Sequence, residues 1–141
     1  AIAMLIISLA VPSVRGVLRE QELRKSFDEF DALVRKAQGR AISEQRSFIL
    51  LWKDDGVVLE PYEPIDTDTA AEPQRLTVSE GETLTIERPA AMEKKPDPEW
   101  IFWRSGLCEP AIISYAGAKG SWRVEYNPLT ARGTFLDQTI Q

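Results

Sequence analysis

Two hydrophobic patterns divide the chain into a long first segment and a remainder of shorter period. The first fourteen residues carry no charged side chain. In the next thirty, apolar and charged side chains recur at spacings of three and four, the period of an amphipathic α-helix. Together these stretches predict one nearly continuous helix from Ala1 to about Glu44. Gly16 and Gly39 weaken it by about 1 kcal/mol each relative to Ala, without interrupting the period.

The uncharged start of this helix, residues 1–14, predicts part of a transmembrane helix. A bilayer core about 30 Å thick needs roughly 20 helical residues, whereas this segment reaches only about 21 Å. We therefore expect residues before Ala1 to complete the span. The membrane and helix-packing positions of the segment are Ile2, Met4, Leu5, Ile6, Ile7, Leu9, Val11, Pro12 and Val14.

Two other interpretations of residues 1–14 stay open. A signal peptide has a basic segment before its apolar core, whereas here Arg15 and Arg19 follow the apolar run. The second alternative is a buried amphipathic helix of a soluble domain. In that case the helix would fold back into a compact core.

Residues 15–46 are predicted to continue the helix as an amphipathic stalk. Acidic residues four positions ahead of basic ones, Glu20 with Arg24 and Asp31 with Arg35, favour helix by a few tenths of a kcal/mol per pair. One apolar face of the stalk should pack against the rest of the protein. That face comprises Phe30, Leu33, Val34, Ala37 and Ala41.

Residues 47–141 change to the patterns of β-structure and predict a single β-rich head. A short apolar run from Ser47 to Trp52, the turn-forming Lys53 to Gly56, and Val57 to Leu59 predict a hairpin. Glu60 to Gln74 and Pro89 to Pro98 are rich in proline and are predicted loops. Further strands are expected at 75–78, 83–87, 100–103, 111–115, 121–126 and around 134–136.

The fold class expected from this order is α+β, with a long N-terminal helix packed on an antiparallel β-rich head. Alternation along the strands predicts which side chains form the core of the head. The expected core residues are Phe48, Leu50, Val58, Leu84, Ile86, Ile101, Trp103, Ile113, Val124 and Tyr126.

Composition argues against most catalytic chemistry. The chain has no histidine, which excludes Ser-His-Asp and Cys-His catalysis, and its net charge of −5 argues against a nucleic-acid partner. Cys108, the single cysteine, lacks a neighbouring group that would activate it and is expected to be structural. Asp54 with Asp55 and Asp66 with Asp68 do not fit an EF-hand and suit turns better. We expect no cofactor, no metal and no catalytic residue.

The acidic side chains and the tryptophans are the remaining candidates for binding. Residues 63–99 hold ten acidic and four basic side chains, which a solvated loop region explains best. Four tryptophans are present, and on a regular strand Trp100 and Trp103 point to opposite faces. A sugar-stacking surface is one role for such residues, and core packing is the commoner one.

The layout resembles the type IV pilin superfamily, in which an N-terminal membrane helix continues as a stalk capped by a β-rich head. Three segments are similar to the H-type minor pseudopilins of type II secretion and related minor pilins. They are the helix-to-strand junction from Leu33 to Arg46, the aromatic strand and glycine turn from Trp100 to Pro110, and the closing strand and turn from Ser121 to Thr130.

This resemblance implies a structural subunit of a type II secretion pseudopilus or type IV pilus-like filament, not an enzyme. It implies a single-pass inner-membrane protein with its head in the periplasm, which joins other pilin or pseudopilin subunits through the N-terminal helix. Prepilin processing, N-methylation and a Glu near the start of the mature helix are also implied, although this chain shows no such motif. The alternative is a membrane-anchored periplasmic or extracellular binding module.

Overall fold

The computed structural model describes residues 2–62, 74–89 and 98–140, with side chains described from residue 17 onward. Its first element is helix α1, Ile2–Glu44, which runs unbroken through Pro12, Gly16 and Gly39. Gln45 then adopts a φ of 53°, the left-handed conformation that commonly ends a helix. The prediction of one nearly continuous helix to about Glu44 is confirmed.

Two antiparallel sheets of four strands each form the head. The first has the order β3-β2-β1-β5, with β1 Phe48–Lys53, β2 Gly56–Pro61, β3 Gln74–Thr77 and β5 Glu99–Phe102. The second has the order β4-β6-β7-β8, with β4 Thr83–Glu87, β6 Ala111–Gly117, β7 Gly120–Tyr126 and β8 Gly133–Ile140. The α+β fold class is confirmed, and β8 is longer than the sequence predicts.

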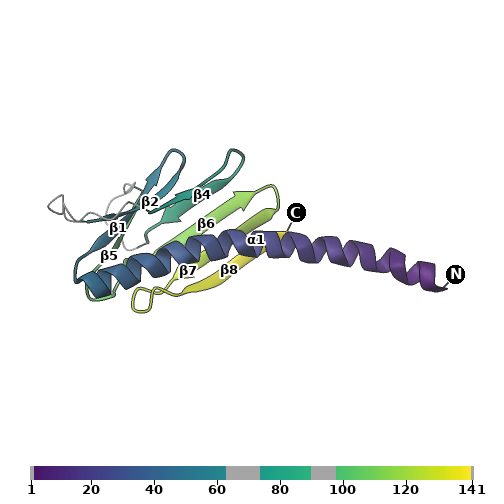
Figure 1. Cartoon of the computed structure of the whole chain (residues 1–141), viewed down its shortest axis with the longest axis horizontal. Helices are drawn as coiled ribbons and strands as arrows, with labels where there is room; N and C mark the ends of the chain where they lie inside the picture. The colour runs from purple at the N-terminus through teal and green to yellow at the C-terminus, as the bar shows by residue number, and fades with distance from the viewer. Residues whose placement is uncertain (1, 63–73, 90–97, 141) are drawn as a thin grey trace.

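The second half of α1 lies along both sheets, while its N-terminal part extends past the ends of the strands (Figure 1). Polar contacts join the sheets to each other. The Trp52 indole N–H on β1 donates to the Leu84 carbonyl on β4 at 3.2 Å. Arg88, directly after β4, forms an ion pair of 3.1 Å with Glu109, whose carboxylate also accepts the Ile101 N–H of β5.

The hairpin predicted at residues 47–59 is formed by β1 and β2, with Asp54 and Asp55 as its two-residue turn. Gly56 pairs with Lys53 as the first residue of β2, so it lies outside the turn itself. A side chain there would collide with β3, because a Cβ on Gly56 would lie 2.0 Å from the Leu76 carbonyl oxygen. This glycine permits close approach of a neighbouring strand.

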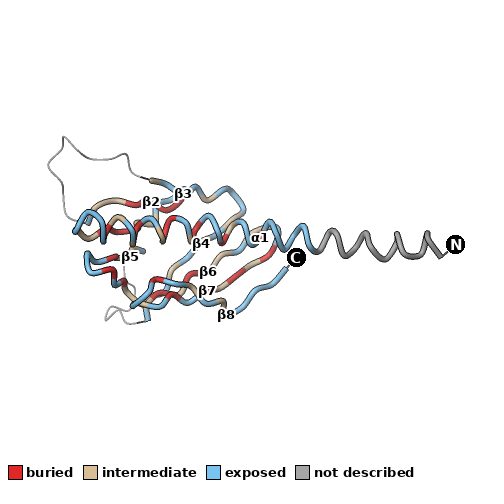
Figure 2. The backbone as a smooth tube through the Cα atoms, turned by 60° about the horizontal axis from the view of Figure 1, so that its bottom comes forward, coloured by how far each residue is buried: buried red, intermediate tan, exposed pale blue. Residues whose placement is uncertain are grey.

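One hydrophobic core fills the space between α1 and the two sheets (Figure 2). Phe30 is completely buried at its centre, with ring contacts to Trp52, Trp100, Trp122 and Tyr126. The stalk face predicted to pack on the head is buried throughout, and Leu23 and Phe27 extend it. The other core members are Phe48, Leu50, Val57, Leu59, Phe102, Cys108, Ala111, Ile113, Val124 and Ala131.

The expected core is correct for most strands and wrong for β5. Trp100 and Phe102 are fully buried, whereas Ile101 is half-buried and Trp103 is 41% exposed. In the sheet, Trp100 pairs with Leu50 and Phe102 with Phe48, so these four side chains share the inner face. Trp103 lies beyond the end of β5.

Three other expected core residues lie in β2 and β4. Val58 is buried but lies outside the cluster that faces α1, whose members from β2 are Val57 and Leu59. Leu84 and Ile86 are half-buried and pack against the cluster from β4. The predicted loops lie largely at residues 63–73 and 90–97, outside the described residues.

Candidate functional site

The sequence places its candidate site at the start of α1, where the structure describes a helical backbone. The side chains of Ile2, Met4, Leu5, Ile6, Ile7, Leu9, Val11, Pro12 and Val14 lie outside the described residues. In the described part of the chain, no helix contains a stretch long and apolar enough to cross a membrane.

The first described side chains of α1 show where the head stops covering the helix. Val17 and Leu18 are 50% and 52% exposed, whereas Leu23 is 1% exposed. From Leu23 onward an apolar side chain faces the core at every turn of the helix. The part of α1 before Leu23 therefore carries apolar side chains that the head does not bury.

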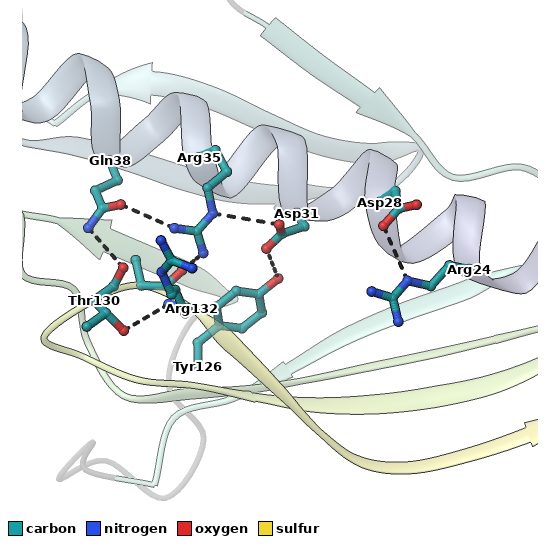
Figure 3. A network of polar contacts seen from close by, with 9 residues as sticks. Arg24, Asp28, Asp31, Arg35, Gln38, Tyr126, Thr130 and Arg132 are labelled. Carbon is teal, nitrogen blue, oxygen red and sulfur yellow. Dashed lines mark hydrogen bonds and ion pairs between the residues drawn. The ribbon is translucent and has the colours of Figure 1, made fainter.

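An open groove of about 380 Å³, here called the arginine groove, lies between α1 and the start of β8. It is lined by Arg24, Phe27, Asp31, Arg35, Arg132 and Gly133. Two of its arginines are held in place. The Arg35 guanidinium lies 3.6 Å from Asp31 and donates to the Ala131 carbonyl, and Arg24 lies 3.5 Å from Asp28 (Figure 3).

Two aromatic rings lie beside the guanidinium of Arg24. Its guanidinium carbon lies 5.3 Å from the centre of the Phe27 ring and 5.1 Å from that of Phe135, within the range of cation–π contacts. The sequence predicts a pair with Glu20, but Arg24 pairs instead with Asp28. The predicted pair of Asp31 with Arg35 is confirmed.

Tyr126 on β7 connects Asp31, a lining residue of the arginine groove, to the head. Its buried hydroxyl donates to the Asp31 carboxylate at 3.0 Å (Figure 3). Burial, together with the negative charge of Asp31, raises the pKa of Tyr126 well above its usual range, so the hydroxyl keeps its proton. Gln38, one turn beyond Arg35, donates to the carbonyls of Gly106 and Thr130.

A second open groove of about 370 Å³, here called the acidic groove, lies beside α1 next to the β3–β4 and β6–β7 turns. Its lining residues are Glu22, Lys25, Ser26, Glu29, Glu80, Gly81, Glu82, Tyr115, Ala118 and Lys119. The Tyr115 hydroxyl donates to Glu82 at 2.6 Å, and Lys119 pairs with Glu22 at 3.2 Å. Burial and the bond to Glu82 raise the pKa of Tyr115 to about 12.

The side chains considered in the sequence as catalytic or metal-binding groups have structural roles where they are described. Cys108 is 1% exposed, and burial raises the pKa of its thiol to about 11, so the nucleophilic thiolate is disfavoured. Asp55 forms an ion pair of 2.8 Å with Arg75, and Asp66 and Asp68 lie outside the described residues. Within the described ranges, no three acidic, cysteine or histidine side chains gather in a way that would hold a metal.

The tryptophans do not form a common surface. Trp100 and Trp122 are buried, and their indole N–H groups donate to the Glu109 carbonyl and the Ser26 hydroxyl. Trp52 is partly buried against the core. Trp103 alone among the four is exposed, which leaves no stacked pair for a sugar ring.

The two grooves are features that the sequence analysis missed. Charged residues at helical spacing, such as Glu22 and Glu29 on one flank and Arg24 and Arg35 on another, were a visible signal. Glu80, Glu82 and Arg132 complete the grooves from distant parts of the chain. Within residues 63–99, β3 and β4 lie where strands are predicted at 75–78 and 83–87, whereas the contribution of Glu80 and Glu82 to the acidic groove was not predicted.

Neither a family model nor a curated protein sequence matches this chain. Solved structures do match. The minor pseudopilin EpsH from the type II secretion system of Vibrio cholerae aligns with a TM-score of 0.54 and 18% identity, over 84% of this chain and 97% of that chain. A second EpsH structure gives 0.58 and 16%, over 84% and 95%.

The type IV minor pilin FimU of Pseudomonas aeruginosa aligns with a TM-score of 0.59 and 14% identity, over 86% of this chain and 95% of that chain. At these identities the likeness concerns the fold. The chain therefore has the pilin-like α+β fold of minor pseudopilins and minor pilins, as the resemblance in its sequence predicts.

Proposed function

We propose that this protein is a structural subunit of a pilin-like filament, a minor pseudopilin of a type II secretion pseudopilus or a minor pilin of a type IV pilus. The observation that carries the proposal is the arrangement of α1. Its second half is packed on the head from Leu23 onward, while its first half leaves the head with exposed Val17 and Leu18. An apolar helix that leaves its own domain needs a membrane or other helices to cover it.

In this proposal residues 1–14 are part of the inner-membrane span, residues 15–46 form the stalk, and residues 47–141 form a periplasmic head. The apolar side chains at the start of α1 first contact lipid. On assembly they exchange lipid for the helices of other subunits, where packing replaces lipid contacts. Each large apolar side chain removed from water contributes roughly 1.5 to 3 kcal/mol, so the segment has no stable position in solvent. No catalytic step is part of this role.

The test follows the protein expressed from its own gene, so that any residues preceding Ala1 are kept. Cell membranes and isolated surface or periplasmic filaments are probed with an antibody against the head. We expect the unmodified protein in both fractions. Leu5→Glu should reduce both strongly, because an acidic side chain in the middle of a membrane helix costs about 2.5 to 3.5 kcal/mol.

The matched control is Leu129→Glu, which places the same charge on a head residue that is 72% exposed. It should leave both fractions unchanged. Recovery in membranes but never in filaments would instead favour the alternative of a membrane-anchored binding module. Recovery of the unmodified protein only in the soluble fraction would contradict both.

A further inference from the structure

The two grooves lie on opposite flanks of the packed face of α1. At about 100° per helical residue, the buried side chains from Leu23 to Ala41 point in one direction. Glu22 and Glu29 project about a quarter turn to one side of that direction, and Arg24 and Arg35 about a third of a turn to the other. The molecule therefore presents a negative groove on one side of its stalk and a positive groove on the opposite side.

The arginine groove holds three arginines against a single aspartate. Asp31 is already engaged by Arg35 and Tyr126. Arg132, directly before β8, is exposed, and its guanidinium has no hydrogen bond or ion pair with the described residues. A planar guanidinium with unused donors is suited to bind a carboxylate with two parallel hydrogen bonds.

The acidic groove holds four glutamates against two lysines. Glu22 is paired with Lys119, and Glu82 accepts the Tyr115 hydroxyl. Glu29 and Glu80 are exposed, and neither side-chain carboxylate forms a hydrogen bond or ion pair within the described parts of the chain. Among the described residues, the unpaired groups on this side are these two carboxylates and the ammonium group of Lys25. With four glutamates against two lysines, the groove keeps a net negative charge that complements the free guanidinium on the other side.

We propose that the arginine groove of one molecule receives the acidic groove of a second copy of this chain, with Arg132 facing the free glutamates. This inference rests on the proposed filament role and specifies the surfaces that neighbouring subunits share. The helix residues of the two grooves span nearly the same stretch, 22–29 and 24–35, so the contact is side by side. Because the two surfaces differ, the contact is heterologous and repeats from copy to copy, as a filament requires. Complementary charge sets the register of such a contact.

Cysteine cross-linking between two differently tagged copies of the full protein, co-expressed in membranes, tests the contact. One copy carries Thr134→Cys beside the arginine groove, and the other carries Ala118→Cys in the acidic groove, both at exposed positions. The native Cys108 is buried and adds little background. A short bismaleimide should link the two different copies at least about fivefold more than either copy to itself, because each surface recognises the other.

Charge reversal then identifies the groups responsible. Arg132→Glu on the first copy should lower the cross-linked yield at least about fivefold. Glu80→Lys on the second copy should lower it similarly, and the two together should restore at least about half of it, because the opposite charges again face each other. Arg104→Glu is the matched control, since Arg104 is exposed and lines neither groove. It should leave the yield unchanged.

Three results would overturn the contact: no preference for the mixed cross-link, equal loss with Arg104→Glu, or no recovery in the charge-swapped pair. These results are separable from the filament role itself. Unmodified protein present in filaments without the mixed cross-link overturns the contact and keeps the role. Protein that cross-links in membranes but is absent from filaments supports the contact and removes the role.

Discussion

At the scale of single residues, burial controls the chemistry of the few reactive groups in this protein. Cys108 and Tyr126 are each 1% exposed, and both pKa values are raised because the charged forms would lose their hydration. Tyr126 also donates to Asp31, which disfavours its phenolate further. These side chains hold α1 and the strands together as neutral groups, which explains why the one thiol of the chain behaves as part of the core.

We predict that Cys108 makes stability depend on pH at alkaline values. Its pKa rises from 9.0 to about 11 on folding, so the folded state holds the proton more tightly than the unfolded state. The resulting stability is complete below about pH 9 and is lost as pH rises through about 11, by up to about 1.4 kcal/mol per pH unit. Urea unfolding over this range should show a shallower decline for Cys108→Ala. Parallel declines for the two proteins would contradict the prediction.

At the scale of elements, both sheets pack against α1. Phe30 contacts aromatic rings from β1, β5 and β7, so a single helical residue bridges the first and the second sheet. The polar links from Trp52 to Leu84 and from Arg88 to Glu109 do not involve α1. The helix is therefore an apolar connection between the two sheets, in addition to the direct ring contact of Trp100 with Tyr126.

We predict that Phe30→Ala lowers the free energy of unfolding by about 3 to 5 kcal/mol, because it leaves a cavity among four aromatic rings. Phe30→Leu, which keeps more of the volume, should lose less and remain folded for measurement. Leu18→Ala is the control on the same helix, since Leu18 is 52% exposed, and should change stability by no more than about 0.5 kcal/mol. Chemical denaturation of the three variants measures their free energies of unfolding. Equal losses at Phe30 and Leu18 would refute the prediction.

At the scale of the whole molecule, the protein divides α1 between two environments. The head covers the helix only from Leu23 onward, and the N-terminal part extends beyond the strands (Figure 1). The flanks of the covered part carry opposite charge in two grooves. A molecule with one uncovered helix end and two complementary sides has the geometry of a unit that repeats.

We predict that removing residues 1–15 leaves the head folded and increases its solubility. The packed face of α1 begins at Leu23, so the deletion removes no described core contact and should change the unfolding free energy by no more than about 0.5 kcal/mol. Membrane fractionation, solubility and denaturation of both forms provide the measurements. If both forms are equally soluble and monomeric, or the deletion destabilises the head by several kcal/mol, the start of the helix folds into the core instead.

Local pattern alone determined the helix, the hairpin and the position of most strands, because periods of 3.6 and 2 are properties of neighbouring residues. The face of α1 from Phe30 to Ala41 followed from that period, and it is buried as expected. The fold class and the likeness to pilins also followed from the order of the elements. The absence of histidine limited the chemistry by composition alone, because no folding of the chain can supply a missing imidazole.

Tertiary structure decided what the periods leave open. Alternation in β5 does not show which set of alternate side chains faces the core. Because Trp100 pairs with Leu50 in the sheet, Trp100 and Phe102 face inward, and Ile101 and Trp103 do not. The rings of Phe27 and Phe135, far apart in the chain, lie beside Arg24 where it pairs with Asp28 and not with Glu20. The grooves likewise join α1 to Glu80 and Arg132, because long-range packing alone brings residues from distant parts of the chain into one surface.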